Sequence, residues 1–167
     1  VMDFAWPSSV TYIFSPDWSM ISTSEQEMFC KRRLPGTRVE FITNPSHPCH
    51  GSRGLFATQD WNQYDVVGEY SGSVCNEDQL NGTGDYRLAI FPSSSYTLYI
   101  DAQETGNETR FINDYRGISA GPNCVFRHTH LQGRPGVVVV VTRAVAEGEE
   151  LLVDYGPAFW PPATDAA

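Results

Sequence analysis

The sequence predicts a mainly β domain of the β-rich α+β class. Short apolar segments alternate with clusters of Gly, Pro, Asn and Ser along most of the chain, a pattern typical of short strands joined by turns. Five consecutive valines at 137–141 have the composition of a strand buried in a sheet core. Helical patterns are confined to 24–33, opened by Ser and Thr, and to a polar stretch near 76–80.

The strand candidates follow one another from residue 38 onward. Pro92 and three serines form a turn between two of them, so that 86–91 and 96–100 are expected to pair as a hairpin. Residues 128–135 are expected to connect a short strand to the valine strand. The predicted strands cover residues 38–42, 55–57, 66–72, 86–91, 96–100, 124–126, 137–142 and 151–153.

Residues 101–123 follow neither a helical nor a strand period, although they contain several aromatic and apolar side chains. An ordered loop of this length in a compact domain is usually functional. The length of 167 residues suits one domain. We expect a flank at 1–37 packed on a main domain at 38–160, with a short C-terminal lid and a tail at 161–167.

Charge and hydropathy exclude some classes of partner. The net charge is −9, from 20 acidic and 11 basic side chains, which argues against direct nucleic-acid binding. It fits a basic, lysine-containing protein or peptide as partner, although solubility alone is an alternative explanation. The longest apolar run is far shorter than the ~18 residues of a membrane-spanning helix, so no membrane association is predicted.

The four cysteines are widely separated and form no CxxC pair, which favours a reduced setting over a disulfide framework. The run His47-Pro48-Cys49-His50 offers three potential zinc ligands within four residues. Ligands this close cannot complete a tetrahedral site without further partners. We therefore expect a turn there in preference to a metal site.

Four sequence segments are informative as a set, because of their order along the chain and their spacing. They are Arg53-Gly54-Leu55-Phe56-Ala57, Gly68-Glu69-Tyr70-Ser71-Gly72, the stretch from Ile100-Asp101-Ala102 through Arg110-Phe111-Ile112-Asn113 to Pro122-Asn123-Cys124, and Gly148-Glu149-Glu150-Leu151 through Asp154-Tyr155-Gly156. Together they resemble the SET-domain family of protein lysine methyltransferases over most of the chain. The resemblance implies short sheets around a pseudo-knot in which the Asn113 and Tyr155 segments are threaded together.

The same resemblance implies that S-adenosylmethionine binds on one face, leaving S-adenosylhomocysteine, and that a substrate lysine enters from the other. The expected catalytic residues are Tyr155 and Tyr70. The expected cofactor-binding residues are Ser52, Arg53, Gly54, Leu55, Phe56, Arg110, Phe111, Asn113, Asp114, Tyr155 and Trp160. The expected channel residues are Tyr70, Tyr86, Phe126 and Val153, although Tyr70 and Tyr86 could instead be ordinary core aromatics.

The implied activity is transfer of a methyl group to the ε-amine of a lysine in a protein, with a histone tail as the expected substrate. An aromatic channel suits this chemistry because it disfavours the ammonium form of a lysine whose free pKa is ~10.4. Asp114-Tyr115-Arg116 stands where many members have His-Ser-Cys. A catalytically weak scaffold that binds proteins therefore stays open as an alternative. The expected location is intracellular, with the nucleus favoured over the cytoplasm.

Overall fold

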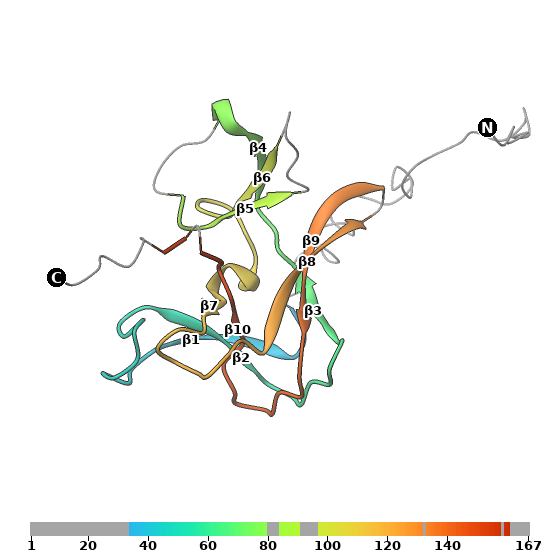
Figure 1. Ribbon diagram of the computed structural model, residues 1–167. Helices are drawn as coiled ribbons and strands as arrows, with labels where there is room; N and C mark the ends of the chain where they lie inside the picture. Colours follow the sequence, from blue (N-terminus) through green and yellow to red (C-terminus); the bar gives the residue numbers. More distant parts are fainter. Residues whose placement is uncertain (1–33, 80–83, 91–96, 132, 158, 161–167) are drawn as a thin grey trace, which may run out of the picture.

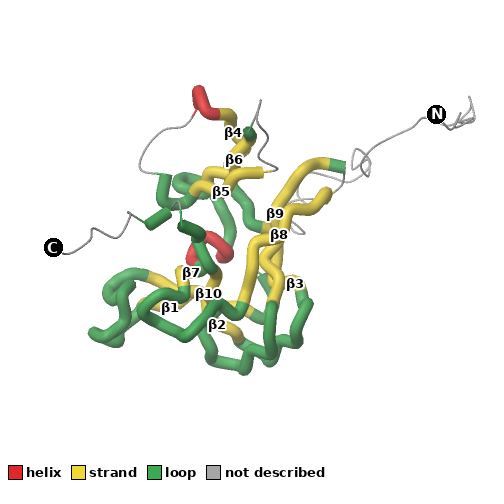
Figure 2. The backbone as a smooth tube through the Cα atoms, viewed as in Figure 1, coloured by secondary structure: helices red, strands yellow, loops and turns green. Residues whose placement is uncertain are grey.

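The computed structural model describes residues 34–79, 84–90, 97–131, 133–157 and 159–160. These residues form short strands and two 3-10 helices, which confirms the β-rich class (Figures 1 and 2). The elements are β1 (Thr37–Phe41), β2 (Arg53–Ala57), β3 (Val66–Glu69), β4 (Ser73–Asn76), η1 (Glu77–Gln79), β5 (Arg87–Ile90), β6 (Leu98–Asp101), η2 (Glu108–Phe111), β7 (Asn113–Asp114), β8 (Cys124–Leu131), β9 (Arg134–Val141) and β10 (Leu152–Val153).

The strands form four small sheets. β1 pairs with β2, β9 lies between β3 and β8, and β6 lies between β4 and β5, all antiparallel. β7 and β10 form a parallel pair. In the view of Figure 1 the β4–β6–β5 sheet lies at the top and the β1–β2 sheet at the bottom, with β7 and β10 between them.

The valine strand is the centre of the core, as its composition predicts. Val137, Val139 and Val141 are completely buried, and β9 has a neighbour on each side. Paired on both edges, the strand satisfies its backbone groups within the sheet, and its alternate valines fill the interior. The predicted pairing of β5 with β6 is also confirmed.

The connection predicted at 128–135 is wrong. β8 and β9 are each eight residues long and pair from Cys124↔Val141 to Leu131↔Arg134. The His128-Thr129-His130 stretch is polar, so it resembles a loop in sequence, yet backbone pairing with β9 makes it a strand. The turn that joins the two strands contains Gly133 with φ of 76°, a left-handed conformation that favours glycine.

Two other segments differ in detail from the sequence-based expectations. The polar stretch near 76–80 holds a single 3-10 turn, η1, after the short strand β4. The long loop contains η2, whose N-cap Asn107 accepts a hydrogen bond from the Thr109 amide. The predicted helix at 24–33 and the tail at 161–167 lie outside the described residues. No helix among the described residues is long and apolar enough to cross a membrane.

Candidate active site

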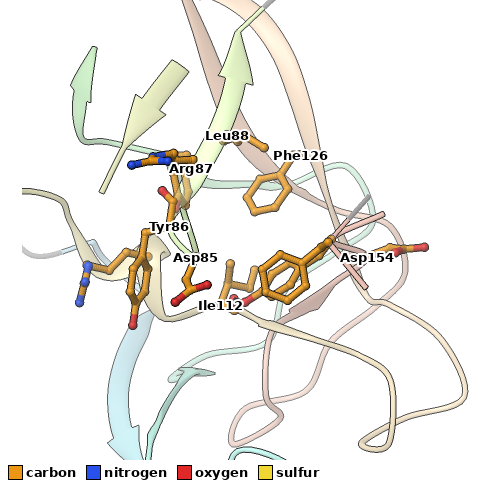
Figure 3. A pocket seen from close by; sticks show the side chains of 11 residues that line it. Asp85, Tyr86, Arg87, Leu88, Ile112, Phe126 and Asp154 are labelled. Atoms are coloured by element: carbon orange, nitrogen blue, oxygen red, sulfur yellow. Dashed lines mark hydrogen bonds between the residues drawn. The ribbon is translucent and has the colours of Figure 1, made fainter. Parts of the chain in front are cut away.

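Two neighbouring cavities share part of their lining. The larger, the aromatic cavity, has a volume of about 240 Å³ and is lined in part by Tyr70 and Phe126 (Figure 3). The smaller, the polar cavity, has a volume of about 130 Å³ and is lined in part by Arg53 and Asn113. The residues that line both cavities are Asp85, Tyr86, Arg110, Tyr155 and Phe159. A molecule in one cavity would therefore lie next to a molecule in the other.

Tyr155 follows the end of β10 by two residues and lines both cavities. Its hydroxyl donates a hydrogen bond of 2.6 Å to the carbonyl of Ile112, and its ring meets Phe159 edge to face at 4.7 Å. Burial raises the pKa of the Tyr155 phenol well above its usual range. The phenol is therefore neutral at physiological pH, and its hydrogen is engaged by the main-chain carbonyl of Ile112.

Tyr70 follows β3 and forms one wall of the aromatic cavity. It is 6% exposed, its hydroxyl donates to the carbonyl of Tyr86 at 2.9 Å, and its ring meets Phe126 edge to face at 5.5 Å. Burial raises the pKa of Tyr70 to about 12. This side of the aromatic cavity therefore consists of two aromatic rings and the neutral phenol of Tyr70.

The polar cavity is formed by β2, η2 and β7. Asn113 Nδ2 donates to the carbonyl of Arg53 at 3.1 Å and to Glu150 Oε1 at 2.8 Å. The guanidinium of Arg110 lies 4.1 Å from the ring centre of Tyr86 and 4.8 Å from that of Phe111. Its Nε donates to the carbonyl of Ala102. Cationic, amide and aromatic groups are therefore held together around one small cavity.

Asp114 is hydrogen-bonded to the Tyr155 main chain and lines neither cavity. Its Oδ2 accepts hydrogen bonds of 2.8 Å from the Tyr155 amide and from Arg116 Nη1, and its Oδ1 accepts from the Arg116 amide. Arg116 also donates to Asp154 Oδ1 at 2.8 Å and lies 5.6 Å from the ring centre of Trp160. The Asp114 carboxylate therefore connects β7 to the segment that carries Tyr155.

Most of the residues predicted from sequence converge on the two cavities. Those that line a cavity are Ser52, Arg53, Tyr70, Tyr86, Arg110, Phe111, Asn113, Phe126 and Tyr155. Those that line neither are Gly54, Leu55, Phe56, Asp114, Val153 and Trp160. Leu55 and Val153 are completely buried in the core, and Trp160 packs edge to face on Phe159 at 5.4 Å.

Several lining residues are not among the predicted site residues, although Ile112 and Asp154 lie within the segments that carry the family resemblance. They are Asp85, Arg87, Leu88, Ile112 and Asp154. Asp85 follows a glycine-rich loop that predicts only a turn. In Figure 3 its carboxylate lies close to Ile112, whereas the Asp154 carboxylate points away from the other labelled side chains. Phe159 belongs to the predicted C-terminal lid and lines both cavities.

The histidine-rich run forms consecutive turns, as expected from its sequence. His47 Nδ1 accepts a hydrogen bond from the Cys49 amide, and its Nε2 lies 2.9 Å from Glu150 Oε2. Both ring nitrogens of His47 are thus engaged by protein groups. Among the residues that the structure describes, no three His, Cys, Asp or Glu side chains are grouped as a metal ion requires.

Comparison with known proteins shows that the chain is similar to proteins named lysine methyltransferases. The chain is 34% identical over 106 residues to histone-lysine N-methyltransferase MEDEA of Arabidopsis thaliana, covering 61% of this chain and 15% of that protein. It is 33% identical over 131 residues to human histone-lysine N-methyltransferase 2B, covering 74% of this chain and 5% of that protein. It is 33% identical over 132 residues to N-lysine methyltransferase KMT5A-A of Danio rerio, covering 72% and 35%. The chain thus spans about a third or less of each relative.

A family model described as the SET domain matches residues 52–156. The match begins at Ser52, in the polar cavity, and ends one residue after Tyr155, at the junction of the two cavities. It therefore includes β2 through β10 and the parallel β7–β10 pair. This chain belongs to the SET-domain family.

Proposed function

We propose that this protein transfers a methyl group from S-adenosylmethionine to the ε-amine of a lysine in a protein substrate. The main support is the meeting of a polar and an aromatic cavity at Tyr155. A methyl donor and an amine must approach each other in line, and two cavities with a common wall allow this approach from opposite sides. In this proposal the cofactor binds in the polar cavity and the lysine in the aromatic one.

The residues of the polar cavity fit this cofactor. Its carboxylate suits the guanidinium groups of Arg53 and Arg110, and its adenine and sulfonium suit the aromatic faces of Phe111 and Phe159. Both Nδ2 hydrogen bonds of Asn113 go to the protein, so Oδ1 is the acceptor that this amide can offer to an ammonium group. When bound, S-adenosylmethionine supplies an electrophilic methyl group.

In the aromatic cavity, Tyr70 and Phe126 would surround the lysine side chain. Their rings exclude water and so favour the neutral amine, the form that can act as a nucleophile. The proton is lost to solvent before the transfer. Because the Tyr70 and Tyr155 hydroxyls donate to main-chain carbonyls, their oxygens are left as acceptors that can orient the amine.

We infer a basic protein segment, a histone tail in the first instance, as the substrate. The net charge of −9 would attract a lysine-rich segment, and MEDEA and the human 2B protein are both named histone-lysine N-methyltransferases. The same names support a nuclear location for this protein.

A labelled-methyl assay on histones and on a lysine-peptide array tests the proposal. Wild type is expected to label at least one substrate, and Tyr155→Phe is expected to label it much more slowly. Equal labelling by the two proteins would remove Tyr155 from the mechanism. Calorimetric titration with S-adenosylmethionine tests the scaffold alternative, because the absence of measurable cofactor binding would favour the scaffold over the enzyme.

A further inference from the structure

A buried carboxylate connects the polar cavity to the histidine-rich turns. Glu150 is 9% exposed, and each of its two oxygens faces a different side chain. Oε1 accepts from Asn113 Nδ2 at 2.8 Å, and Oε2 lies 2.9 Å from His47 Nε2. The side chain of His47 is itself only 11% exposed. Glu150 therefore joins Asn113, which lines the polar cavity, to a residue that does not line it.

The position of Glu150 is set by the backbone and by a glycine. The Leu151 amide donates to the Leu55 carbonyl at 2.8 Å, which holds the chain against β2. A Cβ atom on Gly54 would lie 2.5 Å from Glu150 Oε1, closer than any ordinary contact. A side chain at position 54 would force the carboxylate to move from this position. Gly54 therefore makes room for this carboxylate, although it lines neither cavity.

The proton on His47 can be assigned from its partners. Nδ1 lies 3.0 Å from the Cys49 amide, which can only donate, so Nδ1 is the acceptor. The ring hydrogen of a neutral His47 is then on Nε2 and points at Glu150. Both carboxylate oxygens of Glu150 accept a hydrogen bond. A side-chain amide in place of Glu150 could not do so, because it has only one acceptor oxygen.

We propose that His47 and Glu150 are positioning residues that fix the Asn113 amide for cofactor binding, an inference that rests on the proposed function. Glu150 holds one Nδ2 hydrogen of Asn113, and the Arg53 carbonyl holds the other. The amide cannot turn over without breaking both bonds, so Oδ1 stays available as an acceptor for the cofactor's ammonium. His47 keeps Glu150 in place through its second oxygen.

Paired substitutions of His47 separate its two hydrogen bonds. His47→Asn keeps an acceptor near Nδ1 but loses the donor toward Glu150, whereas His47→Gln keeps a donor at the distance of Nε2. We expect His47→Asn to raise the dissociation constant for S-adenosylmethionine about three- to tenfold, measured by calorimetry, and His47→Gln to recover most of the affinity. His50→Ala, an exposed histidine of the same turns, is the matched control and should bind like wild type.

A double-mutant cycle and steady-state kinetics distinguish positioning from general destabilisation. His47→Asn should have no further effect on cofactor affinity in an Asn113→Ala background. In the single variant, KM for the cofactor should rise while KM for the peptide stays unchanged. Wild-type affinity in His47→Asn, or full additivity with Asn113→Ala, would overturn the inference alone. Absence of cofactor binding by wild type would overturn the proposed function and the inference together.

Discussion

The Tyr155 hydroxyl donates a 2.6 Å hydrogen bond to the main-chain carbonyl of Ile112, 43 residues earlier in the chain. Asp114 lies two residues after Ile112, and its carboxylate accepts a hydrogen bond from the Tyr155 amide. Side chain and main chain of Tyr155 are thus both attached to the segment around β7. The phenol is fixed by contacts made within the protein, before any ligand binds.

Replacing Tyr155 with Phe removes this bond and should affect rate more than folding. The Ile112 carbonyl loses its partner, which we expect to lower the free energy of unfolding by about 1–3 kcal/mol. Loss of one fixed dipole beside the reacting groups should lower kcat by about 10²-fold. Urea denaturation and a single-substrate assay measure the two effects. A fall in kcat fully explained by unfolded protein would contradict a role in the reaction.

Ionisation of Tyr70 should make stability fall at alkaline pH. Its pKa is raised to about 12 in the folded protein, against about 10 in an unfolded chain. Above pH 10 the unfolded chain therefore binds fewer protons than the native protein, so the free energy of unfolding decreases as pH rises toward 12. The contribution of Tyr70 to this decrease is about 2–3 kcal/mol.

Chemical denaturation at several pH values between 8 and 12 measures this effect. Tyr70→Phe should be less stable than wild type at pH 8, because the Tyr86 carbonyl loses a donor, but its stability should fall less steeply above pH 10. Parallel curves for the two proteins would show that Tyr70 does not titrate as its burial predicts.

Asp114→Ala should destabilise the protein strongly. The Asp114 side chain is 4% exposed, and its loss would leave the Tyr155 amide without this acceptor and Arg116 without one of its two carboxylates. We expect the free energy of unfolding to fall by about 2–4 kcal/mol. Asp154→Asn is the comparison, because Asp154 contacts the same guanidinium but is 45% exposed. The loss of stability in Asp154→Asn should be small and should decrease at high salt.

Phe126→Tyr should limit how many methyl groups the product lysine carries. Phe126 lines the aromatic cavity and packs against Tyr70, so an added hydroxyl would occupy space and offer a further hydrogen bond to the amine. Wild type is expected to add more than one methyl group, and the variant should stop at the first. Mass spectrometry of the product at exhaustion distinguishes the two. Monomethyl product alone from wild type would contradict the expected capacity of the cavity.

The sequence predicts those parts of the fold that local patterns determine. The valine run predicts a buried strand, and alternate side chains of β9 do fill the core. The proline and serines at 92–95, which lie outside the described residues, predict the pairing of β5 with β6 that the structure has. The polar end of β8 could not be identified as strand, because backbone pairing with β9 defines it and its side chains are half-buried or exposed.

The candidate site likewise contains residues that local sequence patterns identify and contacts that they do not. The Asn113 and Tyr155 motifs are recognisable locally, and the structure brings both to the polar cavity. The contact of His47 with Glu150 joins residues 103 positions apart, and no local pattern at either residue indicates the other. Asp114 departs from the commoner motif, but only its bonds to Arg116 and Tyr155 show what its carboxylate contacts.

The parallel pairing of β7 with β10 has a consequence for how the chain folds. Asn113 pairs with Leu152, and the β8–β9 hairpin lies between these two residues in the sequence. Closing such a loop costs chain entropy before any contact compensates for it, so non-local pairings of this kind form slowly. We therefore expect β10 to dock last, and a ligand that touches both Asn113 and Tyr155 to slow unfolding by holding β7 and β10 together.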